Sequence, residues 1–405
     1  MNNSSASPFN FEARRALILG TGAFAISFAV WGLISALAPT FKTLYGLSYT
    51  QASTLIAIPV LLGSVMRLPM GTLADRFGGR RVFSILLFFM VLPCATIGFT
   101  HSYYSLLFWA FWLGMAGTSF SIGVSFVTRW LRPEVQGYGL GIYGAGNIGQ
   151  SVAVFFGPVV ARYLGWRWPY WIFAGIALAW AFYFSTAARD APLTRTAPGI
   201  SESLRVLYTQ PLTWVLSVFY FLTFGGFVAL GIYLPSLLKE VFHLTPEDAG
   251  IRTAGFVVLA TLARPLGGWL SDRVGGARVL GGVFAAVAIL AYCLIPQDMG
   301  YFTVGALGIA ASIGLGNGAV FKLVPQYFPR ETGTVTGLVG AAGGLGGFFP
   351  PLVLGYVKQH TDSYTLGFVS LSLYAVICLA LNFVAFLRRS PRLAAPAAQS
   401  PSSSS

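Results

Sequence analysis

Long, uninterrupted apolar runs make up most of this chain, and they constrain its fold more than any other feature. Runs of about twenty residues recur between positions 16 and 387, and only 9% of the 405 residues are charged. An α-helix of that length crosses the hydrocarbon core of a bilayer. Strands of a membrane barrel would instead alternate in polarity over about ten residues. The sequence therefore predicts an all-α, multi-pass protein embedded in the lipid bilayer.

The apolar runs form two sets of six. We place the twelve expected spans at 16–39, 50–73, 82–100, 103–128, 138–162, 168–188, 211–237, 249–271, 279–296, 300–325, 334–357 and 365–387. The longest polar interruption separates the sixth span from the seventh. The predicted organisation is an N-terminal tail at 1–15, a six-helix bundle at 16–188, a linker at 189–210, a second six-helix bundle at 211–387 and a disordered tail at 388–405.

Basic residues are distributed unevenly over the predicted loops. An even number of spans puts both termini on one side, and the segments on that side hold most of the arginines. Cytoplasmic loops carry the excess of Lys and Arg in membrane proteins. The sequence therefore predicts a plasma (inner) membrane protein with both termini in the cytoplasm. The net charge of +13 is explained by this topology, and nucleic acid is not expected as a partner.

Two arginines occupy matching places in the two halves. MRLPMGTLADRFGGRRV (66–82) aligns with ARPLGGWLSDRVGGARV (263–279), which pairs Arg67 with Arg264 at an offset of 197 positions. Each arginine lies inside a predicted span, whereas every Asp and Glu can be assigned to a tail, a loop or a span end. An uncompensated arginine in hydrocarbon costs about 2.5–3.5 kcal/mol on insertion scales, so it marks a binding site or pathway. The pair predicts a small anion as the substrate.

The depth of the arginines supports the same interpretation. Arg67 precedes Asp75 by eight residues on one expected helix, which places it roughly 12 Å inward from the cytoplasmic end. The half-thickness of the hydrocarbon core is about 15 Å. Both arginines therefore reach the region of the midplane, where secondary transporters bind their substrates.

Glycine-rich text forms a second repeat in the fifth and eleventh spans. GLGIYGAGNIG (139–149) aligns with TGLVGAAGGLG (336–346). Small residues let helix backbones approach closely in lipid. We expect helix packing from Gly141, Gly144, Gly146, Gly337, Gly340 and Gly343. Asn147 is an amide on this glycine face, and it either bridges helices or contacts the substrate.

Parallel six-span repeats with GTLADRFGGRR and GWLSDRVGGAR after the second and eighth spans resemble the major facilitator superfamily. The resemblance implies the major facilitator fold, with a central cavity between two bundles. It also implies that the loop residues act as a latch between the bundles on the cytoplasmic side. The latch residues would be Asp75, Arg76, Asp272 and Arg273.

Within that superfamily the chain is similar to the nitrate/nitrite porter family. GLGIYGAGNIGQS (139–151) and GLVGAAGGLGGFFPP (337–351) look like its paired signatures, and Arg67 and Arg264 stand where its substrate arginines are expected. By the same resemblance, YFLTFGGF (220–227) implies a hydrogen bond from Tyr220 to the anion and a cavity wall at Phe224. GTSFSIG (117–123) implies an opposite wall at Phe120. Ordinary packing remains the alternative for these aromatic residues.

Lys322 and Asn317 are polar residues of the tenth span with open roles. Lys322 lies near the cytoplasmic end, where it either extends to the interface or takes part in ion coupling. Asn317, one and a half turns earlier, is a candidate for the pore lining.

The function predicted from these features is transport of nitrate or nitrite by alternating access, with proton-coupled nitrate uptake preferred. The alternatives are nitrate/nitrite antiport or the transport of another small anion such as a monocarboxylate. A membrane sensor or a channel is less well supported, and no set of residues indicates an enzyme, a metal or a cofactor. The three cysteines lack metal-ligand spacing. We expect a monomer.

Overall fold

The computed structural model describes residues 9–192, 200–361 and 363–388. All the long regular elements in these ranges are helices. Those of the first half are α1 (Phe11–Leu44), α2 (Tyr49–Val65), α3 (Arg67–Phe77), α4 (Gly79–Ile97), α5 (Tyr103–Leu113), α6 (Ser119–Thr128), α7 (Gln136–Gly144), α8 (Ile148–Leu164) and α9 (Trp168–Ala187). Then follow α10 (Ile200–Thr209), α11 (Leu212–Phe242), α12 (Pro246–Val274), α13 (Gly276–Leu290), α14 (Met299–Tyr327), α15 (Thr332–Thr361) and α16 (Thr365–Asn382).

The described helices follow the order of the twelve predicted spans. Ten helical segments of the described residues are long and apolar enough to cross a membrane. The remaining two predicted spans coincide with the glycine-rich helical runs 136–164 and 332–361. α1 begins at Phe11, within the segment predicted as a tail, because the Asn10 side chain caps it by accepting a hydrogen bond from Ala13 N at 2.8 Å. The far ends of both predicted tails, 1–8 and 389–405, lie outside the described residues.

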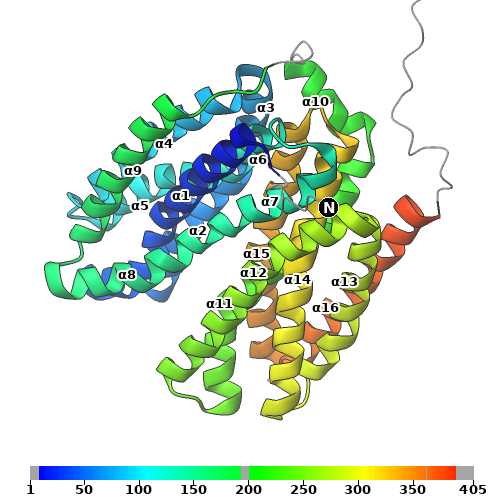
Figure 1. Cartoon of the computed structure of the whole chain (residues 1–405). Helices are drawn as coiled ribbons and strands as arrows, with labels where there is room; N and C mark the ends of the chain where they lie inside the picture. The colour runs from blue at the N-terminus through cyan, green and yellow to red at the C-terminus, as the bar shows by residue number, and fades with distance from the viewer. Residues whose placement is uncertain (1–8, 193–199, 362, 389–405) are drawn as a thin grey trace, which may run out of the picture.

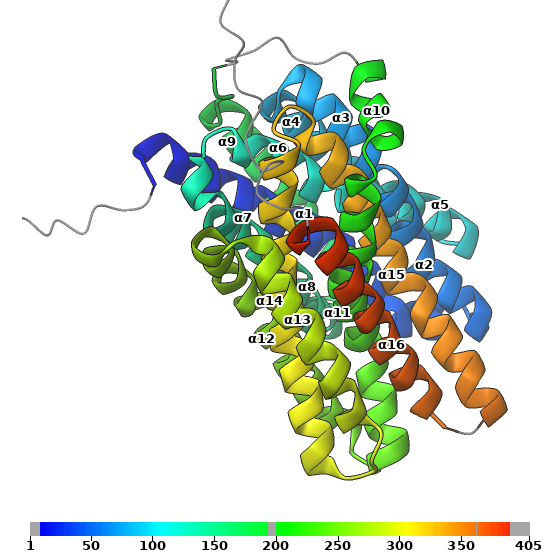
Figure 2. The same ribbon diagram turned by 90° about the vertical axis from the view of Figure 1, so that its right-hand side faces the viewer.

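The two halves are arranged as two groups of helices that meet at one end. In Figure 1 the helices α1–α9 and α11–α16 run close together at the end that carries α3 and α6, and they diverge toward the opposite end. Figure 2 shows α10, from the predicted linker, at the same end as α3 and α4. The linker thus contains a helix that its polar composition did not predict.

Three helix interruptions occur in the first half, beside Arg67 or Arg264. α2 ends at Val65 and α3 begins at Arg67, because Pro69 has no N–H to donate to the Val65 carbonyl. A short 3₁₀ segment, Gly114–Thr118, separates α5 from α6, and another, Ala145–Asn147, separates α7 from α8. Such interruptions leave backbone carbonyls free to accept hydrogen bonds from side chains.

Glycines bring the two halves into backbone contact. A Cβ on Gly71 of α3 would lie 2.0 Å from the Gly333 carbonyl oxygen at the start of α15. In the second half, a Cβ on Gly268 of α12 would lie 1.9 Å from the Gly137 carbonyl oxygen at the start of α7. α3 therefore packs on α15, and α12 packs on α7, at a separation that only glycine permits.

Candidate anion-binding site

Arg67 is the first residue of α3 and is buried between the two halves, with 4% of its surface exposed. Its Nε donates to the Gly117 carbonyl at 3.0 Å, and its Nη1 donates to the Gly340 carbonyl at 2.6 Å. Gly117 belongs to the 3₁₀ segment before α6, whereas Gly340 belongs to α15 of the other half. The guanidinium thus spans the interface between the halves.

Arg264, in α12, makes the corresponding contacts in the opposite direction. It is 3% exposed, and its Nη1 donates to the Gly144 carbonyl of the first half at 3.0 Å. Its Nη2 lies 3.4 Å from the Tyr220 hydroxyl oxygen. When the Asn147 amide is turned with its oxygen toward Arg264, that oxygen accepts from both Nη atoms, at 3.3 Å from Nη2. The structure therefore brings together Arg264, Tyr220 and Asn147, three of the predicted substrate-binding residues.

Phe224 connects the two arginines. The Cζ atom of Arg67 lies 5.6 Å from the centroid of its ring, and the Cζ atom of Arg264 lies 5.4 Å from it. Phe227 adds a second ring at 5.8 Å from Arg264. Aromatic faces attract desolvated cations. Phe224 therefore lowers the cost of holding two positive charges in one buried region.

Stacked aromatic rings lie beside the arginines. Tyr220 stacks on Phe224 with centroids 5.0 Å apart, and Phe120 lies nearly parallel to Tyr220 at 6.5 Å. Phe321 packs edge-on against both Phe120 and Tyr220, at 4.7 Å from each. Sequence reasoning did not single out Phe321 or Phe227, since one phenylalanine among 34 carries no distinguishing signal. The sequence signal that could have pointed to Phe321 was its position one helical turn after Asn317.

A small cavity adjoins Arg67, Asn147 and Phe224. Its volume is about 20 Å³, which is room for roughly one water molecule. The remaining lining residues are Phe28, Trp31, Val60, Gly63, Ser64, Gly117, Gln150, Phe227, Val228 and Gly344. The structure therefore shows the central site nearly closed around its polar groups.

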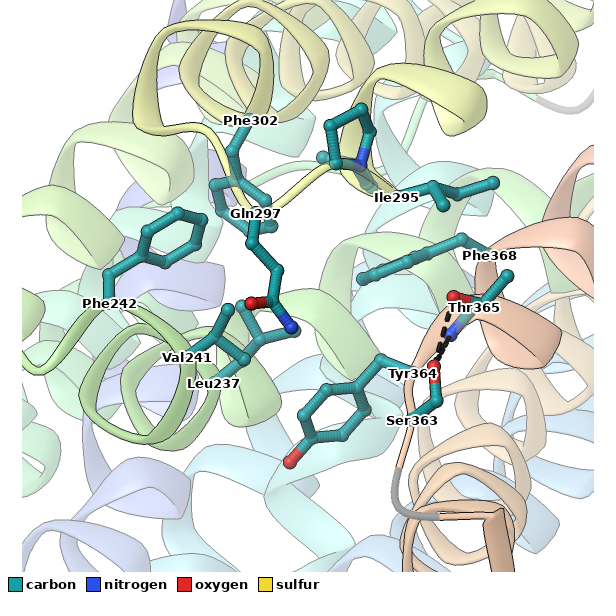
Figure 3. A pocket seen from close by; sticks show the side chains of 12 residues that line it. Leu237, Val241, Phe242, Ile295, Gln297, Phe302, Ser363, Tyr364, Thr365 and Phe368 are labelled. Carbon is teal, nitrogen blue, oxygen red and sulfur yellow. Dashed lines mark hydrogen bonds between the residues drawn. The ribbon is translucent and has the colours of Figure 1, made fainter.

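A separate pocket of about 60 Å³ lies within the second half. Figure 3 shows its mixed lining, in which the side chain of Gln297 lies between the rings of Phe242 and Phe368. The Tyr364 hydroxyl there donates to Glu240 Oε2 at 2.6 Å. Neither Arg67 nor Arg264 lines this pocket, so it is distinct from the central site.

Within residues 9–192, 200–361 and 363–388, no carboxylate forms an ion pair with Arg67 or Arg264. The ion pairs in these ranges involve other basic residues, namely Arg15, Arg129, Arg252, Lys322 and Arg330. The partners of Arg67 and Arg264 are neutral carbonyls, an amide, a phenol and aromatic faces. The site consequently carries two positive charges and offers N–H donors that an oxyanion accepts well.

Asp75, near the end of α3, forms hydrogen bonds that connect the two halves. Its carboxylate accepts hydrogen bonds from Gly333 N at 2.9 Å and Thr334 N at 2.8 Å, at the start of α15. Ser125 Oγ, from its own half, donates to it at 2.7 Å. A carboxylate at a helix N-terminus satisfies free N–H groups and interacts favourably with the helix dipole.

Asp272 repeats this arrangement in the second half. It accepts from Gly137 N at 2.9 Å and from Tyr138 N at 2.7 Å, at the start of α7. Lys322 Nζ lies 2.8 Å from Asp272 Oδ1 and also donates to the Pro133 carbonyl. The structure thus places Lys322 beside Asp272, at the contact between the halves.

The other two residues predicted for the latch each lie over an aromatic ring of their own helix. Arg76 lies over the ring of Phe77, with Cζ 5.4 Å from the centroid, and Arg273 lies over Trp269 at 4.0 Å. Arg129, which was not singled out, donates to the Asp75 carbonyl at 2.7 Å. Its long spacing from Asp75 in the sequence gave no signal for this contact.

The six glycines predicted to pack helices all have close neighbours. A Cβ on Gly141 would lie 2.6 Å from Pro265 Cα, and a Cβ on Gly337 would lie 2.6 Å from Leu68 Cα. The nearest neighbours of the other four are side chains of Arg264 for Gly144, Phe24 for Gly146, Arg67 for Gly340 and Tyr220 for Gly343. Gly144 and Gly340 therefore border the two arginines.

Comparisons with known proteins agree with this architecture. The model of the Major Facilitator Superfamily matches residues 19–351 and 216–403. The solved structure of a human organic anion transporter superposes with a TM-score of 0.76 at 17% identity, covering 92% of this chain and 100% of that one. The Escherichia coli fucose:proton symporter gives a TM-score of 0.76 at 16% identity, covering 92% and 99%. The fold is thus that of a major facilitator, a class of multi-pass membrane transporters and not of enzymes.

Curated relatives narrow the assignment. The nitrite extrusion protein of Bacillus subtilis is 41% identical over 87% of this chain and 90% of its own length. A probable nitrate/nitrite transporter of Mycobacterium tuberculosis is 37% identical over 93% and 96%. A probable nitrate transporter of Staphylococcus epidermidis is 38% identical over 90% and 94%. The chain belongs to the Major Facilitator Superfamily and, within it, to the nitrate/nitrite porter family.

Proposed function

We propose that this chain carries nitrate and nitrite across the plasma membrane by alternating access, and that it takes up nitrate together with protons. The observation that carries the proposal is the buried pair Arg67 and Arg264, which has no carboxylate among its described partners. A planar oxyanion is a ligand that two guanidinium forks can bind bidentately. The names of the relatives in Bacillus, Mycobacterium and Staphylococcus support nitrate and nitrite as that anion.

In the proposed mechanism, each arginine exchanges its bond to the opposite half for a bond to the anion. In the conformation described here, Arg67 donates a hydrogen bond to the Gly340 carbonyl and Arg264 donates one to the Gly144 carbonyl, both across the interface. An anion between the guanidiniums reduces their mutual repulsion and lets the site occlude. Asp75 and Asp272 hold the halves together on one side, and release of their bonds opens that side. The substrate changes the conformation because its affinity differs between the two states.

We further propose that both termini and the Asp75 and Asp272 contacts face the cytoplasm. Support comes from the arginines concentrated in the loops on that side of the sequence-derived topology. The protein would then be closed toward the cytoplasm in the conformation described here. Uptake from outside would begin from this state, with the anion entering from the end at which the helices diverge in Figure 1.

Nitrate/nitrite exchange is a second candidate, and the same charge pair favours it. An empty site with two desolvated positive charges is costly to occlude, so the carrier would return most readily with another anion bound. A probable nitrate/nitrite antiporter of Thermus thermophilus is 35% identical over 90% of this chain and 89% of its own length. Net uptake instead requires protons, because an inward-negative potential opposes anion entry by about 2.3 kcal/mol per charge per 100 mV.

Proteoliposomes test both modes with the purified full chain. Labelled nitrate uptake is measured with and without nitrite inside, while the pH gradient and the membrane potential are varied separately. Uptake into nitrite-free vesicles that increases with an inward proton gradient supports symport. Uptake that requires internal nitrite or nitrate supports exchange. If vesicles take up formate or acetate but neither nitrate nor nitrite under any of these gradients, nitrate and nitrite are rejected as the substrates.

A further inference from the structure

Asn317 is a buried amide in α14 whose role the contacts described so far do not explain. It is 2% exposed, and neither its Oδ1 nor its Nδ2 has a hydrogen-bond partner among the described residues. A buried amide without a partner is costly in an apolar surrounding. In a membrane-spanning helix no solvent compensates for the loss. A bound polar ligand that hydrogen-bonds to the amide would remove this cost.

The internal repeat shows which position of the fold Asn317 occupies. The offset of 197 positions between Arg67 and Arg264 also relates Gly117 to Gly314 and Phe120 to Asn317. A Cβ on Gly117 would lie 3.2 Å from Gly63 Cα, and a Cβ on Gly314 would lie 2.3 Å from the Ala260 carbonyl oxygen. Gly63 and Ala260 are separated by the same 197 positions. The packing of α14 on α12 thus repeats the packing of the fourth span on the second.

A second pair of contacts fixes the same register. Ser121 Oγ donates to the Arg67 carbonyl at 3.0 Å, and a Cβ on Gly318 would lie 2.3 Å from the Arg264 carbonyl oxygen. Ser121 and Gly318 directly follow Phe120 and Asn317. Phe120 in the first half and Asn317 in the second half therefore lie at the same depth as the arginine of their own half.

The helix face of Asn317 agrees with this placement. Phe321 follows it by one turn, and residues four apart share a helix face. Phe321 contacts Phe120 and Tyr220, which border the central site. Asn317 is consequently directed to the same side of α14 as Phe321, toward the central site.

We infer that Asn317 is a further substrate-binding residue whose side-chain N–H groups donate to an oxygen of the bound oxyanion. The inference rests on the proposed function and deepens it, because it makes the site asymmetric. The first half provides an aromatic wall at Phe120, whereas the second half provides hydrogen-bond donors at the equivalent position. Three kinds of donor, guanidinium, phenol and amide, would then determine which oxyanions are accepted.

Asn317→Leu separates a binding role from a structural one. Leucine has nearly the same size but offers no donor. Because the amide has no protein partner, its replacement should leave the melting temperature of the anion-free protein unchanged or raised. The Kd for sodium nitrate, measured by titration calorimetry at constant ionic strength, should rise at least about tenfold, as expected for a lost hydrogen bond to a charged ligand.

Asn382→Leu is the matched control. Asn382 is a fully buried amide in the same half, and its Nδ2 donates to the Ala277 carbonyl at 2.8 Å. Its replacement should lower the melting temperature and leave the Kd for nitrate unchanged. Asn317→Ser, which keeps a hydroxyl donor, should retain more affinity than Asn317→Ala, and this second pair decides the matter if the leucine variant does not fold.

The outcomes distinguish the inference from the proposed function. If the wild-type protein neither binds nor transports nitrate or nitrite, the proposed function is wrong. If the wild type binds nitrate but Asn317→Leu binds it equally well, the inference is wrong and the function stands. An equal rise in Kd for Asn317→Leu and Asn382→Leu would also overturn the inference, because it would show a general loosening of the half.

Discussion

Arg67 donates a hydrogen bond of 2.6 Å to the carbonyl of Gly340, a residue of the opposite half. The repeat-related pair reverses the direction, since Arg264 of the second half donates to Gly144 of the first at 3.0 Å. The two glycines align in the internal repeat, as do the two arginines. Duplication thus generated two equivalent bonds that cross the same interface in opposite directions.

Replacement of either arginine by lysine should abolish most transport. Arg67→Lys or Arg264→Lys keeps the charge but loses the planar fork. The affinity for nitrate should fall about 10- to 100-fold, as expected for one or two hydrogen bonds to a charged group. Nitrate uptake in proteoliposomes measures the effect. Arg252→Lys, at an exposed pair with Asp248, is the control, and wild-type flux in either site variant would contradict the role of the fork.

Gly71→Ala should prevent the halves from closing. The added methyl would lie 2.0 Å from the Gly333 carbonyl oxygen, and the facing group is backbone that cannot move aside. We expect loss of uptake and greater reactivity of cysteines introduced along the cytoplasmic interface. Gly282→Ala, with no neighbouring atom within 4 Å, should behave as the wild type. Normal transport by Gly71→Ala would show that this closure is not part of the cycle.

Lys322 should act through Asp272, its ion-pair partner at 2.8 Å. Lys322→Met leaves a buried carboxylate with fewer partners and should weaken the closed state by about 1–3 kcal/mol. A double variant that also removes the charge of Asp272 should regain part of the lost stability of the closed state. Melting temperatures and nitrate fluxes of both single variants and of the double variant measure this coupling. A Lys322→Met variant that folds normally but no longer responds to a proton gradient would instead assign Lys322 to ion coupling.

Glu331 should make stability depend on pH. It lies between α14 and α15, and burial raises the pKa of its carboxyl group, with nearby Arg330 acting in the opposite direction. A carboxyl whose pKa is higher in the folded state stabilises that state below the unfolded pKa, and the contribution is lost as the pH rises through the folded pKa. Glu331→Gln should therefore have a higher melting temperature than the wild type at about pH 8 but not at about pH 4. Equal pH profiles would contradict this assignment.

Phe224→Leu should destabilise the anion-free site without removing any hydrogen bond. Both guanidinium groups lie within 5.6 Å of its ring centroid, and leucine has no π face. We expect the empty site to become less stable and the KM for nitrate to change severalfold. Phe284→Leu, which replaces a ring buried in the second half against Phe219, controls for lost packing. Matching KM values for the two variants would argue against a specific role for Phe224.

The sequence predicted the helical class, the order of the spans and the arginine pair, because each depends on local composition or on the internal repeat. It did not predict the backbone partners of the arginines. Gly117, Gly144 and Gly340 contribute backbone carbonyls, which no residue type identifies. The contact of Arg129 with Asp75 and that of Lys322 with Asp272 depend on how helices pack, and the repeat does not fix that packing. The helix α10 was missed because its polar residues match those of a linker.

The helix interruptions beside Arg67 and Arg264 have a consequence for substrate choice. The carbonyls of Gly117 and Gly144, at or beside two interruptions, already occupy donors of the arginines, as does that of Gly340. An incoming solute therefore competes with peptide oxygens and not with bulk water. A weak hydrogen-bond acceptor cannot displace these carbonyls from the arginines, whereas a negatively charged acceptor can. These bonds thus set a threshold of acceptor strength that an anion must exceed before the bonds between the halves break.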